Sequence, residues 1–146
     1  VNNIVKESIE LTRKEYENNG IILELEEIEH FSIMGDKDRL KEVFINILKN
    51  GKEALENREN KKINVKILKD RVVITDNGIG MTEEETSKIF NLYFTTKKDG
   101  TGIGLFRVKK IVEAHNGEII MNSKKGHGTE VSIILKKKKK KLSSGV

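Results

Sequence analysis

The 146-residue chain contains no cysteine, no proline and no tryptophan, and only 5% of its residues are aromatic. Without cysteine it forms neither disulfides nor thiolate zinc sites, which is compatible with a reducing cytoplasm. No run approaches the roughly 20 apolar residues of a membrane-spanning helix, and residues 1–5 lack the basic and apolar regions of a secretion signal. The 36% of apolar residues suffice for one modest core, so the composition indicates a single domain.

The positive charge of the chain is concentrated near its C-terminal end. The formal net charge is +5, but residues 136–141 are six consecutive lysines. Without them, 22 basic residues face 23 acidic ones, a net charge of −1. Such a run is usually a solvated, disordered end, so we expect neither nucleic-acid binding nor membrane contact from the domain itself. The alternative is an electrostatic contact of the lysines with an acidic partner, an anionic lipid or nucleic acid.

Hydrophobic periodicity predicts a mixture of helices and strands. Apolar residues at helical spacing indicate helices that begin near residues 1, 37 and 104, and Thr82 with Glu85 forms a capping box for a shorter one. Alternating or continuous short apolar runs indicate strands. The expected strands are 21–25, 31–34, 63–67, 72–76, 117–121 and 129–135. Three main helices with five or six strands are typical of a two-layer α/β sandwich.

Two asparagines lie one turn apart on the clearest expected helix. Apolar residues from Leu40 to Leu55 recur at spacings of three and four, and Asn46 and Asn50 form a second stripe beside them. Asparagine is a poor residue for a helix interior, while its amide oxygen is a hard ligand suited to Mg²⁺. The alternative is that both amides simply satisfy nearby backbone groups.

An aspartate stands where an apolar strand ends. Asp76 follows Val72–Ile74 and precedes the residues Asn77-Gly78-Ile79-Gly80. Its carboxylate can accept a hydrogen bond from an exocyclic amine such as that of adenine, and the two glycines let a flat base approach the backbone. Taken alone, Asp-Asn-Gly between apolar residues favours a hairpin turn.

A glycine-alternating loop opens the last expected helix. Glycines alternate from Gly100 to Gly104, and backbone N–H groups at a helix start bind phosphate well. Lys97 and Lys98 precede this loop and can add positive charge near a γ-phosphate. The spacing fits neither a Walker loop nor a dinucleotide fingerprint, and a flexible hinge explains the loop equally well in isolation. In this order, however, the asparagines, Asp76 and the glycine loop together describe a pocket for one nucleotide.

These ordered motifs resemble the GHKL ATP-binding domains, specifically the catalytic domain of bacterial sensor histidine kinases. The resemblance covers residues 20–135. Residues 39–50 look like the N box, 76–81 match the G1 box, 89–97 resemble the F box, 100–105 match the G2 box and 126–129 resemble the closing glycine-threonine motif. Residues 112–117 also fit the family's pattern, which implies a structural role for His115.

The resemblance implies a fold and a set of site residues. The fold would be a Bergerat-type α/β two-layer sandwich, with a mixed sheet of about five strands and three helices on one face. Asn50 would coordinate Mg²⁺ at the phosphates of ATP, Asn46 would support them, Asp76 would select adenine, and residues 82–101 would form the ATP lid. Asn46, Asn50 and Lys97 would act in catalysis. The residues implied to bind nucleotide are Asn46, Asn50, Asp76, Gly78, Gly80, Met81, Phe90, Phe94, Thr96, Lys97, Gly100, Thr101, Gly102, Ile103, Gly104, Leu105 and Thr129.

One position separates kinases from hydrolases within the family that the chain resembles. Gyrase, mismatch-repair and chaperone ATPases carry a glutamate one turn before the metal asparagine, where it acts as a base for water. Asn46 occupies that place here, and an amide cannot remove a proton, so the resemblance favours a kinase. The sequence also departs from the family: Gly51 stands where most relatives have alanine. Glu53 stands where many have a basic residue, which makes Lys97 a candidate for phosphate contact.

The histidine that accepts the phosphoryl group is not expected within this chain. Sensor kinases place it on a dimerising helical hairpin, usually close to a proline, and none of His30, His115 and His127 lies in such a setting. The expected division is an N-terminal helix at 1–19, the catalytic domain at 20–135 and a tail at 136–146. This would be a monomeric fragment of a dimeric kinase that does not phosphorylate itself alone.

The function implied by the resemblance is transfer of the γ-phosphate of Mg-ATP to a histidine on a separate dimerisation domain. The phosphoryl group would then pass to an aspartate of a response regulator, in cytoplasmic two-component signalling, whether or not the full-length kinase is anchored to a membrane. The alternative is a catalytically silent module that binds ATP or ADP and regulates a partner through closure of its lid alone.

Overall fold

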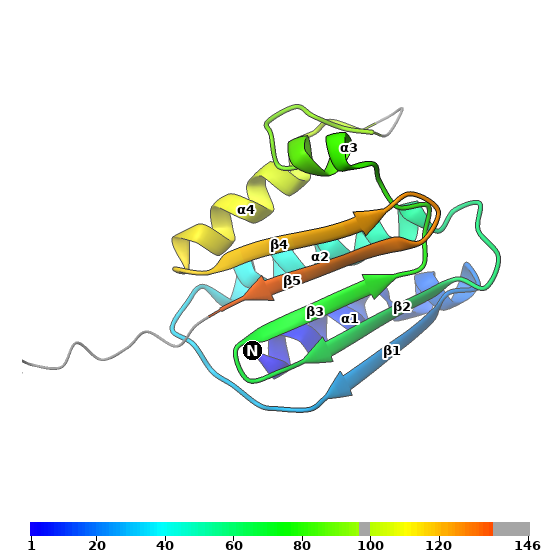
Figure 1. Ribbon diagram of the computed structural model, residues 1–146. Helices are drawn as coiled ribbons and strands as arrows, with labels where there is room; N and C mark the ends of the chain where they lie inside the picture. Colours follow the sequence, from blue (N-terminus) through cyan, green and yellow to red (C-terminus); the bar gives the residue numbers. More distant parts are fainter. Residues whose placement is uncertain (97–99, 136–146) are drawn as a thin grey trace, which may run out of the picture.

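The computed structural model is a five-stranded mixed sheet that carries its helices on one face (Figure 1). It describes residues 1–96 and 100–135, so the predictions for Lys97 and for the lysine-rich tail lie outside the described residues. The strands are β1 (Ile22–Glu27), β2 (Lys62–Ile67), β3 (Arg71–Asp76), β4 (Glu118–Lys124) and β5 (Gly128–Ile134). The helices are α1 (Asn2–Asn18), α2 (Lys37–Ala54), α3 (Glu83–Lys88) and α4 (Gly104–Ala114).

The sheet has the strand order β1-β2-β3-β5-β4. β1 pairs with β2 in parallel, and the other three pairs are antiparallel. Successive side chains of a strand point to opposite faces, so Ile63, Val65 and Ile67 of β2 are buried under the helices. On the other face, Lys62 pairs with Glu24 across the strands. This arrangement confirms the predicted two-layer sandwich with a mixed sheet.

Helix α2 occupies the centre of the helical layer, between α1 and α4 (Figure 1). Asp36 caps its N-terminus by accepting a hydrogen bond from the backbone N–H of Arg39 at 3.1 Å. Its buried residues follow the predicted helical period: Leu40, Val43, Phe44, Ile47, Leu48 and Gly51. Because α2 is buried along these residues and packs between two other helices, it can hold the side chains of a site in fixed positions.

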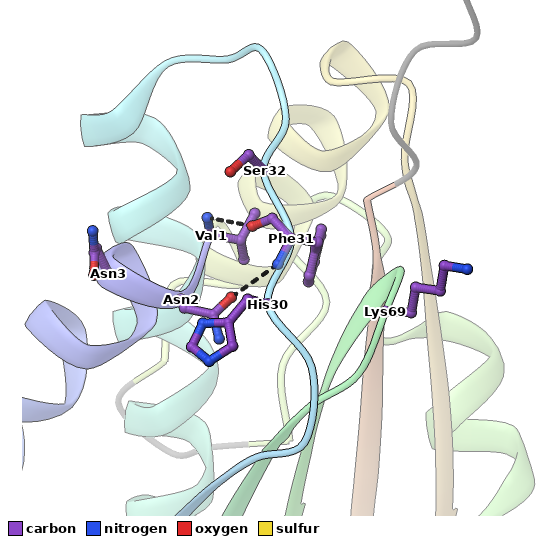
Figure 2. Close-up of a pocket in the computed structure, with 7 residues that line it drawn as sticks. All are labelled: Val1, Asn2, Asn3, His30, Phe31, Ser32 and Lys69. Carbon is purple, nitrogen blue, oxygen red and sulfur yellow. Dashed lines mark hydrogen bonds between the residues drawn. The ribbon is translucent and has the colours of Figure 1, made fainter.

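The segment between β1 and α2 contains no strand, so the expectation of a strand at residues 31–34 was wrong. Its backbone bonds to the start of α1 instead (Figure 2). The ammonium group of Val1 donates to the carbonyl of Phe31 at 3.0 Å, and the side-chain oxygen of Asn2 accepts from the Phe31 N–H at 3.2 Å. The Asn2 amide also donates to the carbonyl of Glu29 at 2.9 Å. These bonds satisfy the polar backbone groups that a strand ladder would otherwise use.

Candidate nucleotide-binding site

Motifs that are far apart in the sequence meet along helix α2. A Cβ atom added at Gly104, the first residue of α4, would lie 3.7 Å from the side-chain oxygen of Asn46. A Cβ atom added at Gly51 would lie 3.6 Å from a carboxylate oxygen of Asp76. The two contact points are five residues apart on α2, or about 8 Å along its axis. The glycine loop and the aspartate therefore lie beside the same helix that carries Asn46 and Asn50.

Asp76 lies at the end of β3, where its carboxylate is largely buried. One of its oxygens accepts the backbone N–H of Gly78 at 2.8 Å. Burial raises the pKa of Asp76 to about 6, while hydrogen bonds from the backbone N–H groups of Gly78 and Thr129 act in the opposite direction. Thr129 is also its partner in the β3–β5 register. The strand end thus presents a carboxylate that is ionised at neutral pH and whose charge is poorly solvated.

The glycines after Asp76 are required by the fold itself. A Cβ atom at Gly78 would lie 2.7 Å from both the Cβ and the carbonyl oxygen of Ala54, at the end of α2. Gly80 has a φ of +67°, and a Cβ atom there would overlap the carbonyl of Lys124. The sequence argument assigned both glycines the role of making room for a base. That role stays a prediction, because packing against Ala54 and Lys124 demands glycine in either case.

The predicted lid begins and ends on defined contacts. The Met81 N–H donates to the hydroxyl of Ser123 at 2.8 Å, and that hydroxyl lies 2.7 Å from the hydroxyl of Thr129. The predicted capping box of α3 is present, with Thr82 and Glu85 bonded reciprocally. Met81 and Thr129, both predicted site residues, are therefore connected through a serine that sequence reasoning did not select.

The far end of the lid returns to the start of α4. The Tyr93 N–H donates to the carbonyl of Gly102 at 2.9 Å, and both residues have a left-handed φ, +68° and +70°. A Cβ atom at Gly102 would overlap the Tyr93 backbone, so only glycine fits this crossing. Phe90 is half-buried, and the Lys109 ammonium lies 5.6 Å from its ring centre. Of the remaining predicted residues, Phe94 and Leu105 are half-buried, while Thr96, Gly100, Thr101 and Ile103 are exposed.

Comparison with known proteins decides the family. The family described as histidine kinase-, DNA gyrase B- and HSP90-like ATPases matches residues 35–139. The chain belongs to this ATPase family. It is 37% identical to sporulation kinase E of Bacillus subtilis over 139 residues. The matched region covers 92% of the chain and 19% of that protein. It is 35% identical over 139 residues to the sensor histidine kinase ZraS of Salmonella typhimurium, covering 92% of the chain and 30% of that protein.

Solved structures agree with the sequence relatives. The catalytic domain of histidine kinase ThkA, in a nucleotide-free form, superposes with a TM-score of 0.78 at 29% identity, covering 94% of this chain and 93% of that one. The chain therefore corresponds to the ATPase catalytic domain of sensor histidine kinases, which confirms the resemblance and the fold. It spans less than a third of the two curated relatives just described.

Sequence reasoning missed an arginine of this histidine-kinase domain that bonds to the backbone of Asn77, the residue after Asp76. Arg58 follows α2 and donates to the carbonyl of Gly126 at 2.9 Å and to the carbonyl of Asn77 at 3.4 Å. It therefore ties the glycine-rich segment after β3 to the β4–β5 turn. Arg58 lies in a polar loop without periodicity, so no local pattern in the sequence distinguishes it from its neighbours.

Two hollows of the ATPase domain differ in their relation to the groups that meet along α2: the larger lies apart from these groups, and the smaller includes Asp76. The larger, about 500 Å³, is at the start of α1 beside Val1 and His30 (Figure 2). The smaller, about 310 Å³, lies at the ends of β3, β4 and β5 and includes Asp76 and Thr129. Neither is lined by a residue of α2. The donor and acceptor groups that mark the candidate site meet instead along α2.

The donors for a metal ion in this ATPase domain would be amides. Across residues 1–96 and 100–135, no three His, Cys, Asp or Glu side chains gather closely enough to hold a metal ion. Asn46 and Asn50 are half-buried on α2, and a Cβ built at Gly104 would lie 3.7 Å from the Asn46 oxygen without a close contact, so there is room between Gly104 and Asn46. This donor set fits Mg²⁺, which keeps several waters and takes other ligands from phosphates.

None of the described helices is long and apolar enough to cross a membrane.

Proposed function

We propose that this domain binds Mg-ATP and transfers the γ-phosphoryl group to a histidine on a separate dimerisation domain. The observation that carries the proposal is the meeting of Asn46, Gly104 and Asp76 along α2. This arrangement offers a carboxylate for the base and, about 8 Å further along the helix axis, amide and glycine groups for the phosphates. A ribose would bridge that separation.

At the phosphate end, Asn50 would be the protein ligand of Mg²⁺, and Asn46 would lie beside it one turn earlier. When bound, the ion would withdraw negative charge from the β- and γ-phosphates, which is the main need of phosphoryl transfer. The backbone N–H groups at the start of α4, next to Gly104, would face the phosphates because a helix N-terminus favours anions.

At the base end, Asp76 would accept a hydrogen bond from the exocyclic amine of adenine. The hydrogen bond from Gly78 already orients one of its oxygens. Guanine has a carbonyl where adenine carries that amine, and a carbonyl would face the carboxylate with no proton between them. The pairing therefore supports selection of adenine over guanine nucleotides.

The surroundings of Asn46 support transfer to an imidazole over hydrolysis. Asn46 is an amide and cannot activate water. The carboxylate one turn before it, Glu42, is bound by the guanidinium of Arg107, with a distance of 3.1 Å for one of the two bonds. Bidentate pairing with arginine occupies the oxygens that a general base would need. We therefore expect slow ATP hydrolysis by the domain alone.

In the intact kinase the phosphoryl group would pass on to an aspartate of a response regulator, in two-component signalling at the cytoplasmic side.

The test is calorimetry with Mg-ATP and Mg-ADP, followed by trans-phosphorylation of histidine-bearing hairpin domains from related sensor kinases. We expect binding of both nucleotides and labelling of the acceptor histidine, lost in Asn50→Ala and in an acceptor without its histidine. Binding without transfer to any acceptor would support the regulatory module instead.

A further inference from the structure

His115, the residue that ends α4, makes one local and one long-range hydrogen bond. Its Nδ1 lies 2.8 Å from the carbonyl of Ile111, one turn earlier in the same helix. Its Nε2 accepts the backbone N–H of Asp36 at 3.0 Å, although the two residues are 79 positions apart. Because the Asp36 N–H can only donate, Nε2 carries no proton. The proton of the neutral ring is then on Nδ1, from which it is donated to Ile111.

The His115 ring also occupies the space that a side chain at Gly35 would need. A Cβ atom added at Gly35 would overlap Cδ2 of the His115 ring and lie 2.7 Å from Nε2. Gly35 does not have a left-handed φ, so its lack of a side chain serves the contact with His115 and no special turn. Asp36, the next residue, is the N-cap of α2. The imidazole therefore docks the end of α4 onto the start of the helix that bears the asparagines.

α4 runs antiparallel to α2 (Figure 1). Two hydrogen-bonded contacts and one close approach lie at successive positions along the pair. His115 meets Asp36, the guanidinium of Arg107 meets Glu42, and Gly104 lies beside Asn46. Ten residues separate the outer contacts on α2 and eleven on α4, or about 15 and 17 Å along the two axes. These lengths match, so the hydrogen bond at His115 fixes how far α4 extends toward Asn46.

We propose that His115 is a positioning residue, whose neutral ring sets the axial position of α4 so that Gly104 stays beside Asn46. The inference rests on the proposed nucleotide site for its functional consequence. The two hydrogen bonds of the ring distinguish this role from ordinary helix capping. The bond to Ile111 caps the end of α4, whereas the bond to Asp36 fixes the position of α4 on α2. A substitution at Gly35 can disturb the second bond while His115 itself is kept.

The test compares two replacements of the ring. In His115→Gln the amide oxygen reaches the place of Nε2 and can accept the Asp36 N–H. In His115→Asn the shorter amide reaches only the place of Nδ1. Gly35→Ala displaces the ring while keeping the histidine, and His30→Gln serves as the control. The readouts are the NMR shifts of the Gly104 backbone amide and Asn46 side-chain amide in the nucleotide-free protein, the affinity for Mg-AMPPNP, and unfolding in urea.

We expect His115→Asn and Gly35→Ala to shift both NMR signals and to weaken Mg-AMPPNP by about 3- to 10-fold, the factor that corresponds to one net hydrogen bond. His115→Gln should restore most of the affinity, and the double variant Gly35→Ala/His115→Asn should lose no more than either single variant, because both break the same contact. Equal behaviour of the Asn and Gln variants, or additive losses, would overturn the proposal. So would lower stability with unchanged NMR signals and affinity.

Failure of the proposed function would look different. If the parent protein did not bind Mg-AMPPNP, the nucleotide site would be wrong, while the nucleotide-free spectra would still decide whether His115 positions α4. Long-range ¹H–¹⁵N spectra of the imidazole give an independent check. They should show the proton on Nδ1, and a ring protonated on Nε2 alone would contradict the geometry.

Discussion

Replacing Asp76 by asparagine should stabilise the nucleotide-free domain at neutral pH while weakening its binding of adenine nucleotides. Burial raises the pKa of this carboxyl from 3.8 to about 6 in the folded protein. A pKa difference of that size means that the ionised carboxylate lowers the free energy of unfolding by about 3 kcal/mol. Asparagine removes the charge but presents an N–H group to one of the two backbone donors, at a cost of about 1 kcal/mol.

The sign follows from protonation in the two states. Well below pH 3.8 the carboxyl carries its proton in both states, and Asp76 causes no electrostatic destabilisation. Above about pH 6 it is ionised in both states, and the folded state bears the full desolvation cost. Asp76→Asn should therefore be about 1 kcal/mol less stable than the parent in acid and about 2 kcal/mol more stable at neutral pH. The neutral-pH gain corresponds to roughly 4–8 °C in Tm.

The assay is urea unfolding of both proteins across this pH range, with Glu56→Gln as a control that removes one exposed charge. The free-energy difference between Asp76→Asn and the parent should change sign as pH rises, and the control should show no such change. Calorimetry at neutral pH should show weaker ATP binding by Asp76→Asn. A pH-independent stability difference would refute the buried-carboxylate argument, and unchanged ATP affinity would remove Asp76 from the nucleotide site.

Three further substitutions probe the frame of the site. Gly51→Ala should raise the free energy of unfolding in urea by up to ~1 kcal/mol, because alanine has the higher helix propensity. The added Cβ would lie 3.2 Å from Cδ1 of Ile63, the end of a side chain that has to shift by only a few tenths of an ångström; a clear loss of stability would contradict this. Gly80→Ala should cost at least about 2 kcal/mol in the same assay, since its φ is +67° and its Cβ would overlap backbone; a cost below about half of that would contradict the tight approach. Thr82→Ala should leave global unfolding nearly unchanged but lower hydrogen-exchange protection in α3, which buries none of its residues; a large fall in global stability would count against this.

Sequence alone predicted the elements whose pattern is local. The period of apolar residues placed α2, and the order of asparagine, aspartate and glycine motifs indicated the family that the comparisons confirmed. The same reasoning failed at residues 31–34, where Phe31 and Ile33 alternate like a strand. There the backbone is satisfied by the side chain of Asn2 and the N-terminal ammonium, and no periodicity encodes such a partner.

Two long-range contacts that support the site escaped prediction. Arg58 reaches Gly126 across 68 positions, and His115 reaches Asp36 across 79. Neither contact leaves a trace in local spacing, because each depends on how the elements pack. The roles assigned to the site residues, including Mg²⁺ binding by Asn50, stay predictions. The position of Lys97 lies outside the described residues.

The most direct test of the account is a crystal structure of the domain with Mg-AMPPNP. We predict the adenine amine at the carboxylate of Asp76, Mg²⁺ at the amide oxygen of Asn50, and the phosphates against Asn46 and the first N–H groups of α4. A nucleotide bound elsewhere, such as the hollow at the start of α1, would contradict the claim that one ligand joins these groups. So would a bound nucleotide that contacted Asp76 but left both asparagines without a phosphate or metal.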